Sequence, residues 1–397
     1  MRVYFAPCGI GLGHVGRTVP IAKRLAEQKA NIIFSTYREG TSYIKRERLR
    51  LIEAPPIGFQ VKADGTIDFR LTTANPGPFL ASFTVLKQIG AEIRSMKRFK
   101  PDIIVSDSRI SPLAAARALR IPRVCLLNQF QVIVPRRKRF LRLARLADFG
   151  TLTLVGKMWT SGNTVLIPDF PFPYTICVGN LHIPRNYRRN VKLIGPILPV
   201  RANELPAAEE LRAKLGLQQE KTIVYAPISG PLNERAFITH VLKKLLIEFP
   251  EKYEVVMSLG YPSANTKPIR SKNAVIFDWI PNRFEYLKAS DVVIARAGHG
   301  TITQCMSYGK PMILIPTPSH TEQISNAKQA SDLGVAKVIQ QENVTKEKLL
   351  EKVNLIMTSD MHYRLARVQR NVSGHDGLEN AAKIIAGIVE RKASVLS

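Results

Sequence analysis

The sequence predicts an α/β protein of two doubly wound domains that face each other across a cleft. Short apolar runs, typical of buried parallel strands, alternate with helical segments in the first half of the chain, and the pattern starts again in the second half. A stretch rich in proline and small residues separates the halves. We therefore expect an N-terminal domain over residues 1–197, a linker over 198–215 and a C-terminal domain over 216–397, whose last helix returns to the N-terminal domain.

The expected strands are recognised by their apolar runs. In the first half they are RVYFAP, NIIFST, PDIIVSD and RVCLLN, and in the second half KTIVYAPIS, EVVMSLG, AVIFDWI, DVVIARAG and PMILIPTP. Ligands of doubly wound sheets bind beyond the carboxyl ends of the strands. The loops after RVYFAP, IVYAPI, FDWIP and VVIARAG are therefore the places to look for a site.

The composition is that of a globular protein, with 45% hydrophobic residues among 397. No apolar run is long enough to span a bilayer, and the N-terminus lacks the apolar region of a signal peptide, so we expect a cytosolic protein. Cys8, Cys125, Cys177 and Cys305 lie far apart in the sequence. We expect them to be buried reduced thiols that form neither a metal site nor a disulfide.

The net charge of +27 is concentrated in the first half of the chain. Of the 58 basic residues 32 fall within residues 1–200, together with 11 of the 31 acidic residues. So strong a field indicates a polyanionic partner, either an anionic membrane surface or a nucleic acid. A proteome or a hot habitat that simply favours lysine and arginine is the alternative.

The first glycine loop, GLGHVG, follows a strand and precedes a helix, as in dinucleotide-binding folds. The second strand, however, ends in Ser-Thr-Tyr instead of an acidic residue, so Arg38 would have to hold a 2′-phosphate; an NADP-dependent oxidoreductase stays open on that basis. A histidine in the loop, His14, is better suited to proton transfer at the mouth of a cleft. Capping of the helix is the structural alternative for His14.

The second glycine turn, ARAGHGTITQ, also leads from a strand into a helix. Gly298 and Gly300 allow close approach of a partner or positive φ angles, and Thr301 and Thr303 supply hydroxyls at the helix start. A helix N-terminus with these residues predicts a site for a phosphate or another anion.

Three stretches together resemble the GT-B-fold nucleotide-sugar glycosyltransferases. They are GLGHVGR near the N-terminus, IGP before the linker, and the fifty-residue stretch from FDWIPNRFEYLKASDVVIARAGHGT to HTEQISNA. The sequence is most similar to the lipid II-forming N-acetylglucosaminyltransferases (MurG) and to the macrolide and UDP-glucuronosyl-type transferases. The resemblance implies a GT-B fold, inverting transfer, and a nucleotide sugar as co-substrate with no further cofactor. The chain has no D-x-D triplet, so no metal is expected.

The resemblance assigns His14 as general base on the acceptor hydroxyl and Asp107 as the carboxylate that orients it. A cap on the following helix is the alternative for Asp107. The residues that the resemblance places around the donor are Gly13, Ser229, Gly230, Ile280, Arg296, Gly298, His299, Gly300, Thr301, Gln304, Glu322, Gln323 and Asn326.

Four of the donor residues have particular implied roles. Arg296 would neutralise the leaving nucleoside diphosphate, while Glu322, with Gln323 beside it, would hold hydroxyls of the donor sugar. The family usually has glutamate where Gln304 stands, contacting the ribose. The resemblance favours UDP, and the glutamine at this position leaves GDP or another nucleotide open.

The segment PRRKRFLRLARLA, Pro135–Ala147, predicts a basic amphipathic helix. Such a helix typically binds an anionic membrane, so we expect a lipid-linked acceptor reached by a peripheral enzyme at the inner membrane face. RNA as the acceptor, a small-molecule acceptor, a non-enzymatic nucleic-acid-binding protein and ordinary packing of the helix are the alternatives. The residues expected to contact the membrane or acceptor are Arg136, Arg137, Lys138, Arg139, Phe140 and Arg142.

Overall fold

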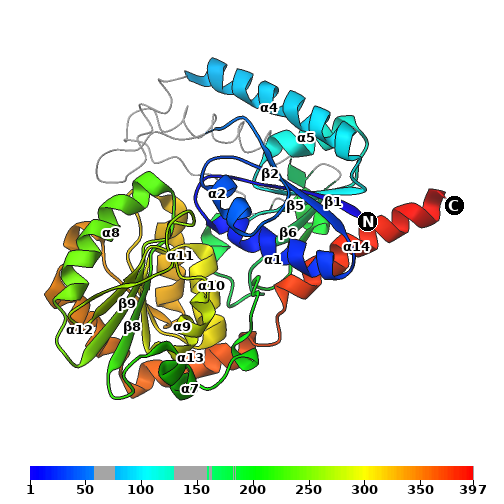
Figure 1. Ribbon diagram of the computed structural model, residues 1–397. Helices are drawn as coiled ribbons and strands as arrows, with labels where there is room; N and C mark the ends of the chain where they lie inside the picture. Colours follow the sequence, from blue (N-terminus) through cyan, green and yellow to red (C-terminus); the bar gives the residue numbers. More distant parts are fainter. Residues whose placement is uncertain (58–76, 129–158, 161–162, 182, 184, 397) are drawn as a thin grey trace, which may run out of the picture.

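The computed structural model describes residues 1–57, 77–128, 159–160, 163–181, 183 and 185–396, which form two α/β units (Figure 1). Each unit is built on a sheet of seven strands with helices packed against it. The predicted class, an α/β protein with two doubly wound sheets, is therefore confirmed.

The first sheet has the strand order β3-β2-β1-β4-β5-β6-β7, and all of its strand pairs are parallel. The order reverses between β1 and β4, which places a crevice at the carboxyl ends of these two strands. The strands are β1 (Arg2–Pro7), β2 (Asn31–Thr36), β3 (Leu51–Glu53), β4 (Ile103–Asp107), β5 (Arg123–Leu126), β6 (Thr164–Ile167) and β7 (Val191–Leu193). The helices described in this unit are α1 (Gly13–Glu27), α2 (Glu39–Arg46), α4 (Gly77–Phe99), α5 (Ile110–Ala118), and the 3-10 helices η1 (Cys177–Asn180) and η2 (Arg185–Asn190).

The second sheet has the order β10-β11-β9-β8-β12-β13-β14, parallel except for the pair β10 and β11. Its strands are β8 (Thr222–Pro227), β9 (Tyr253–Ser258), β10 (Ile269–Ser271), β11 (Ala274–Phe277), β12 (Val292–Ala295), β13 (Met312–Leu314) and β14 (Ala336–Val338). Its helices are α7 (Ala208–Leu215), α8 (Leu232–Ile247), α9 (Arg283–Ala289), α10 (His299–Tyr308), α11 (Thr321–Asp332), α12 (Lys346–Ile356), α13 (Ser359–Val372), and the 3-10 helices η3 (Ala202–Glu204) and η4 (Gln341–Asn343).

The last helix, α14 (Gly377–Leu396), leaves the second unit and packs against α1 of the first (Figure 1). Its buried residues Ala381, Ala382 and Ile385 belong to the core of the first unit. The crossing requires glycine at Gly377, because a Cβ there would lie 2.0 Å from the Gly195 carbonyl oxygen. The chain therefore connects the two units twice.

Apolar residues fill both faces of each sheet, as the continuous apolar runs predict. Within the part of the chain that the structure describes, no helix combines the length and the apolar character needed to cross a bilayer. The basic segment Pro135–Ala147 and its residues Arg136 to Phe140 and Arg142 lie outside the described residues.

Candidate active site

A cavity of about 500 Å³ lies between the two units and is lined by residues of both. The first unit contributes the loop after β1, Arg17 of α1, and Ser108, Asn128 and Pro168, which follow β4, β5 and β6. The second unit contributes the loops after β8, β9, β11 and β12 together with the start of α11. Of the residues predicted for catalysis and donor binding, His14, Gly13, Ser229, Gly230, Ile280, Gly298, His299, Gly300, Thr301, Gln304, Glu322 and Gln323 line this cavity.

The loop that carries His14 is shaped by close backbone packing. A Cβ at Gly9 would lie 1.8 Å from the Tyr37 carbonyl oxygen, and Gly11 adopts a φ of +71°. His14 then falls in the first turn of α1, with 23% of its side chain exposed. The N-cap residue of α1 is Leu12, which makes no side-chain cap. His14 is therefore not a helix cap, and it faces the cavity.

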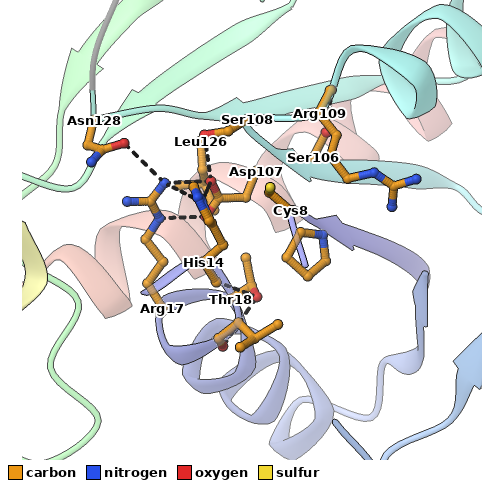
Figure 2. Close-up of polar contacts among 12 residues, drawn as sticks. Cys8, His14, Arg17, Thr18, Ser106, Asp107, Ser108, Arg109, Leu126 and Asn128 are labelled. Atoms are coloured by element: carbon orange, nitrogen blue, oxygen red, sulfur yellow. Dashed lines mark hydrogen bonds and ion pairs between the residues drawn. The ribbon is translucent and has the colours of Figure 1, made fainter. Parts of the chain in front are cut away.

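Asp107 is the partner of His14. Strands β1 and β4 pair in parallel with Pro7 opposite Asp107, so the end of β4 lies beside the loop that follows β1. His14 Nδ1 and Asp107 Oδ1 are 2.7 Å apart, as Figure 2 shows. Asp107 does not cap α5, whose N-cap is Arg109 without a side-chain cap. A histidine held by a buried carboxylate in this way presents its other ring nitrogen, Nε2, for proton transfer.

The Asp107 carboxyl stays ionised although it is completely buried. Burial works against its charged form, but the charges and hydrogen bonds of Arg17 and His14 outweigh burial and lower the pKa to about 2. Arg17 donates to both carboxylate oxygens of Asp107 at 2.5 Å. The carboxylate that orients His14 is thus itself held by a guanidinium.

The second glycine turn forms the opposite wall of the cavity. Gly298 has a φ of −71° and Gly300 lies within α10, so the positive φ angles that we considered are wrong for both. The two glycines are better explained by the close approach of a ligand to the backbone, because no atom of the protein lies within 4 Å of the place where either Cβ would stand. The backbone bond from Ile302 N to Gly298 O leaves the N–H groups before Ile302 without an intrahelical partner. This turn is suited to receive an anion.

His299, in the same turn, lies against a carboxylate from the other unit. Its Nε2 is 3.0 Å from Asp169 Oδ2, and both side chains are almost fully buried. Cys177 completes a group whose ligand atoms lie within 4.8 Å of one another, close enough to suggest a metal. Asp169 Oδ2, however, already accepts the backbone N–H groups of Ile176 and Cys177. Hydrogen bonds to the backbone thus hold Asp169 in place, whereas His299 Nε2 meets Asp169 at ion-pair distance without a hydrogen bond of its own among the described residues.

Arg296 and Asn326 do not line the cavity, which corrects two of the predicted donor contacts. The Arg296 guanidinium is buried and donates to Ile315 O and Gln341 Oε1. Burial lowers its pKa to about 10, although the charge of Glu234 opposes this. Asn326 is also buried and donates to Ala297 O. Asn326 therefore supports the turn through Ala297, whereas Arg296 is anchored to the residue after β13 and to η4.

The start of α11 faces the first unit. Gln323 is held by its Oε1, which accepts from the backbone N–H and the hydroxyl of Thr317. Glu322 Oε1 accepts from Asn128 Nδ2 at 2.5 Å. Glu322, which was predicted to hold the donor sugar, is therefore hydrogen-bonded to the Asn128 side chain of the first unit.

Glu234, in the first turn of α8, is a cavity residue that the sequence analysis missed. Its side chain is almost fully buried, and its Oε2 has no hydrogen-bond partner among the described residues. Burial raises its pKa to about 7, while Arg296 opposes the shift and Glu39 adds to it. A carboxyl that titrates near neutrality therefore lies at the cavity beside the loop after β8.

Three further residues were also missed, and two of them follow strand ends. Asn128 and Asp169 come shortly after β5 and β6, at the same sheet edge as Asp107, and this position was the available signal. Arg17 is three residues after His14 on α1, a spacing at which helical side chains meet.

Of the cysteines, Cys125, Cys177 and Cys305 are buried and free, and Cys8 is partly buried at the cavity.

Comparisons with known proteins agree with this geometry. Residues 230–384 match the glycosyltransferase family 28 C-terminal domain. Over 403 residues the chain is 27% identical to an uncharacterized glycosyltransferase of Methanosarcina mazei, with 99% of each chain covered. Over 380 residues it is 21% identical to the UDP-N-acetylglucosamine--N-acetylmuramyl-(pentapeptide) pyrophosphoryl-undecaprenol N-acetylglucosamine transferase of Clostridium tetani, with 94% of each covered. The structure of the spinosyn rhamnosyltransferase SpnG shares the fold, with a TM-score of 0.65, 14% identity, and coverage of 98% of this chain and 100% of that one.

The fold, the cavity and these matches define a glycosyltransferase of the GT-B fold that uses a nucleotide sugar. This class replaces the oxidoreductase and the non-enzymatic binding protein among the alternatives. Within the class, the chain resembles the MurG transferases, as its RAGHGT turn and HTEQ segment predict.

Proposed function

We propose that the enzyme transfers the sugar with inversion and that His14 removes the proton from the acceptor hydroxyl. The observation that supports this most is the shared cavity, in which His14 and the turn Gly298–Thr301 form walls from opposite units. An acceptor beside His14 would attack the sugar from the side opposite a diphosphate at α10. A single displacement of that kind inverts the anomeric centre.

We propose a UDP-linked donor and transfer without a metal ion. The N-terminus of α10 offers N–H groups without intrahelical partners and a partial positive charge to the leaving diphosphate, a task that a divalent ion performs in other transferases. Activity should be unchanged in EDTA. A strict requirement for Mg²⁺ or Mn²⁺ that EDTA abolishes would contradict metal-independent transfer.

A screen for binding and hydrolysis over UDP-glucose, UDP-N-acetylglucosamine, UDP-galactose, GDP-mannose and dTDP-glucose tests the donor. We expect binding and slow hydrolysis of a UDP-sugar, because the Clostridium tetani relative is named for a UDP-linked donor. Gln304 at the cavity can bond ribose hydroxyls as a neutral partner, which suits UDP and GDP alike. Selective binding of GDP-mannose would keep the reaction and change the nucleotide. If no nucleotide sugar binds, the proposed function is wrong.

For the acceptor we propose a lipid-linked molecule at the inner face of the membrane. The excess of basic residues in the first 200 positions supports an anionic surface, and the Clostridium tetani relative is named for a pyrophosphoryl-undecaprenol substrate. RNA is the second candidate, because the same charge suits a phosphate backbone. Co-sedimentation with phosphatidylglycerol vesicles should be strong for the wild type and weak after Arg136, Arg137, Lys138 and Arg139 are all changed to serine. Equal sedimentation of both, or salt-sensitive binding of RNA alone, would contradict the lipid proposal.

A further inference from the structure

Arg17 binds both oxygens of the Asp107 carboxylate, which orients His14. Its Nε donates to Asp107 Oδ2 and its Nη2 donates to Asp107 Oδ1, each at 2.5 Å (Figure 2). The side chain of Asp107 is fully buried and that of Arg17 is 12% exposed, so water screens this pair little. A two-point contact of this kind fixes the plane of the carboxylate as well as its position.

The contact leaves Asp107 one orientation toward His14. Its Oδ1 accepts from His14 Nδ1 at 2.7 Å, from Arg17 Nη2 and from the hydroxyl of Ser108 at 3.0 Å. Rotation of the carboxylate would break the bonds to Arg17 as well as the bond to His14. A lysine at position 17 would keep the charge but not the planar fork that prevents this rotation.

Arg17 also connects the His14 side of the cavity with the donor side. Its Nη2 lies 3.5 Å from Asn128 Oδ1, and the Nδ2 of the same amide donates to Glu322 Oε1 at 2.5 Å. Asn128 must therefore orient its oxygen toward Arg17 and its nitrogen toward Glu322. Arg17 and Asn128 together therefore link the His14–Asp107 pair to the Glu322 carboxylate at the cavity.

We propose that Arg17 is a positioning residue of the transfer reaction, which holds Asp107 so that His14 keeps the orientation needed to deprotonate the acceptor. The proposal rests on the proposed role of His14 as general base. Arg17 also lines the cavity, and its Nη2 lies 3.2 Å from His14 Nδ1, so it acts on the orientation of the His14 ring and not on the reacting atoms. The guanidinium fork, rather than positive charge alone, is the property that matters.

The first test compares Arg17→Lys and Arg17→Gln with Arg24→Gln in steady-state hydrolysis of the UDP-sugar that the wild type binds best. Arg24 is a matched control, because it lies two turns further along α1 and pairs at the surface with Glu27 and Glu379. We expect kcat to fall about 10²-fold in both Arg17 variants with KM nearly unchanged, since small misplacements of a reacting group cost this much. Guanidinium chloride at millimolar concentration should restore part of the activity of an Arg17→Ala variant. Arg24→Gln should behave as the wild type.

The second test measures the hydrogen bond of the His14 ring by NMR and does not depend on enzymatic activity. The proton NMR resonance of His14 Nδ1–H, assigned by its loss in His14→Gln, should persist in Arg24→Gln and broaden or disappear in Arg17→Lys. Loss of the resonance in a protein that hydrolyses no nucleotide sugar would support the positioning role while the proposed function fails. Wild-type kcat in folded Arg17→Lys, or a raised KM with unchanged kcat, would overturn the proposal. Should Arg17→Gln fail to fold, Arg17→Lys carries both tests.

Discussion

Asp169 and His299 come from different units, and their Oδ2 and Nε2 atoms lie 3.0 Å apart in an almost fully buried contact. The Asp169 carboxylate also accepts the backbone N–H groups of Phe170, Ile176 and Cys177, so its position does not depend on His299. Because His299 belongs to the glycine turn at the cavity, this contact connects that turn to the N-terminal unit.

We expect His299→Gln to weaken UDP binding about tenfold, or ~1.4 kcal/mol, because the turn loses its support from Asp169. Isothermal titration with UDP measures this directly. The matched control is His362→Gln, an exposed histidine of α13 whose Nδ1 contacts Thr358 O. Unchanged affinity in the His299 variant would show that the contact between the units does not shape the donor turn.

Asp107 should make the protein sensitive to acid. Its folded pKa of about 2 lies below the value of about 3.9 expected in the unfolded chain, so the carboxylate stabilises the fold above pH 4 and this contribution is lost as the pH falls toward 2. We expect Asp107→Asn to lower the free energy of unfolding by about 2–3 kcal/mol at pH 7 and to flatten its pH dependence between 4 and 2. Urea denaturation across that range measures both effects.

The control for this experiment is Asp102→Asn, because Asp102 lies at the surface beside Arg2. This variant should keep the slope of the wild type. An Asp107→Asn curve that is parallel to the wild-type curve between pH 4 and 2 would contradict the assignment.

Glu234 should have the opposite effect on how the free energy of unfolding depends on pH. Its folded pKa of about 7 lies above the unfolded value near 4.3, so the fold loses stability as the pH rises from about 4 through 7 and the buried carboxyl ionises. We expect Glu234→Gln to raise the unfolding free energy at pH 8 by up to about 3 kcal/mol and to change it little at pH 4. UDP should also bind more tightly to the variant at pH 8, because a negative charge beside the donor loop is removed.

Thermal unfolding and UDP titration at pH 4.5 and pH 8 test this prediction. Glu248→Gln, at the exposed end of the same helix, is the control. A destabilised Glu234→Gln at pH 8 would mean that the ionised carboxylate has a favourable partner there.

The fold and much of the cavity could be predicted because local signals carry them. Apolar runs predicted the strands, and the glycine turns at strand ends predicted a site where His14 and Gly298 indeed line the cavity. The position of Arg296 could not be predicted in this way, because it depends on Ile315 and Gln341, which are 19 and 45 residues away in the sequence. The contact of Asp169 with His299 depends on how two separate units meet, and no periodicity encodes that.

The central claim is that His14 is the base of the transfer reaction, and His14→Ala tests it most directly. We expect kcat to fall by about 10²–10⁴-fold, because the loss of a general base costs this much, while the UDP affinity stays within about twofold. Turnover and isothermal titration on the same preparation separate the two effects. A variant that keeps most of its turnover but binds UDP weakly would make His14 a binding residue and contradict the mechanism.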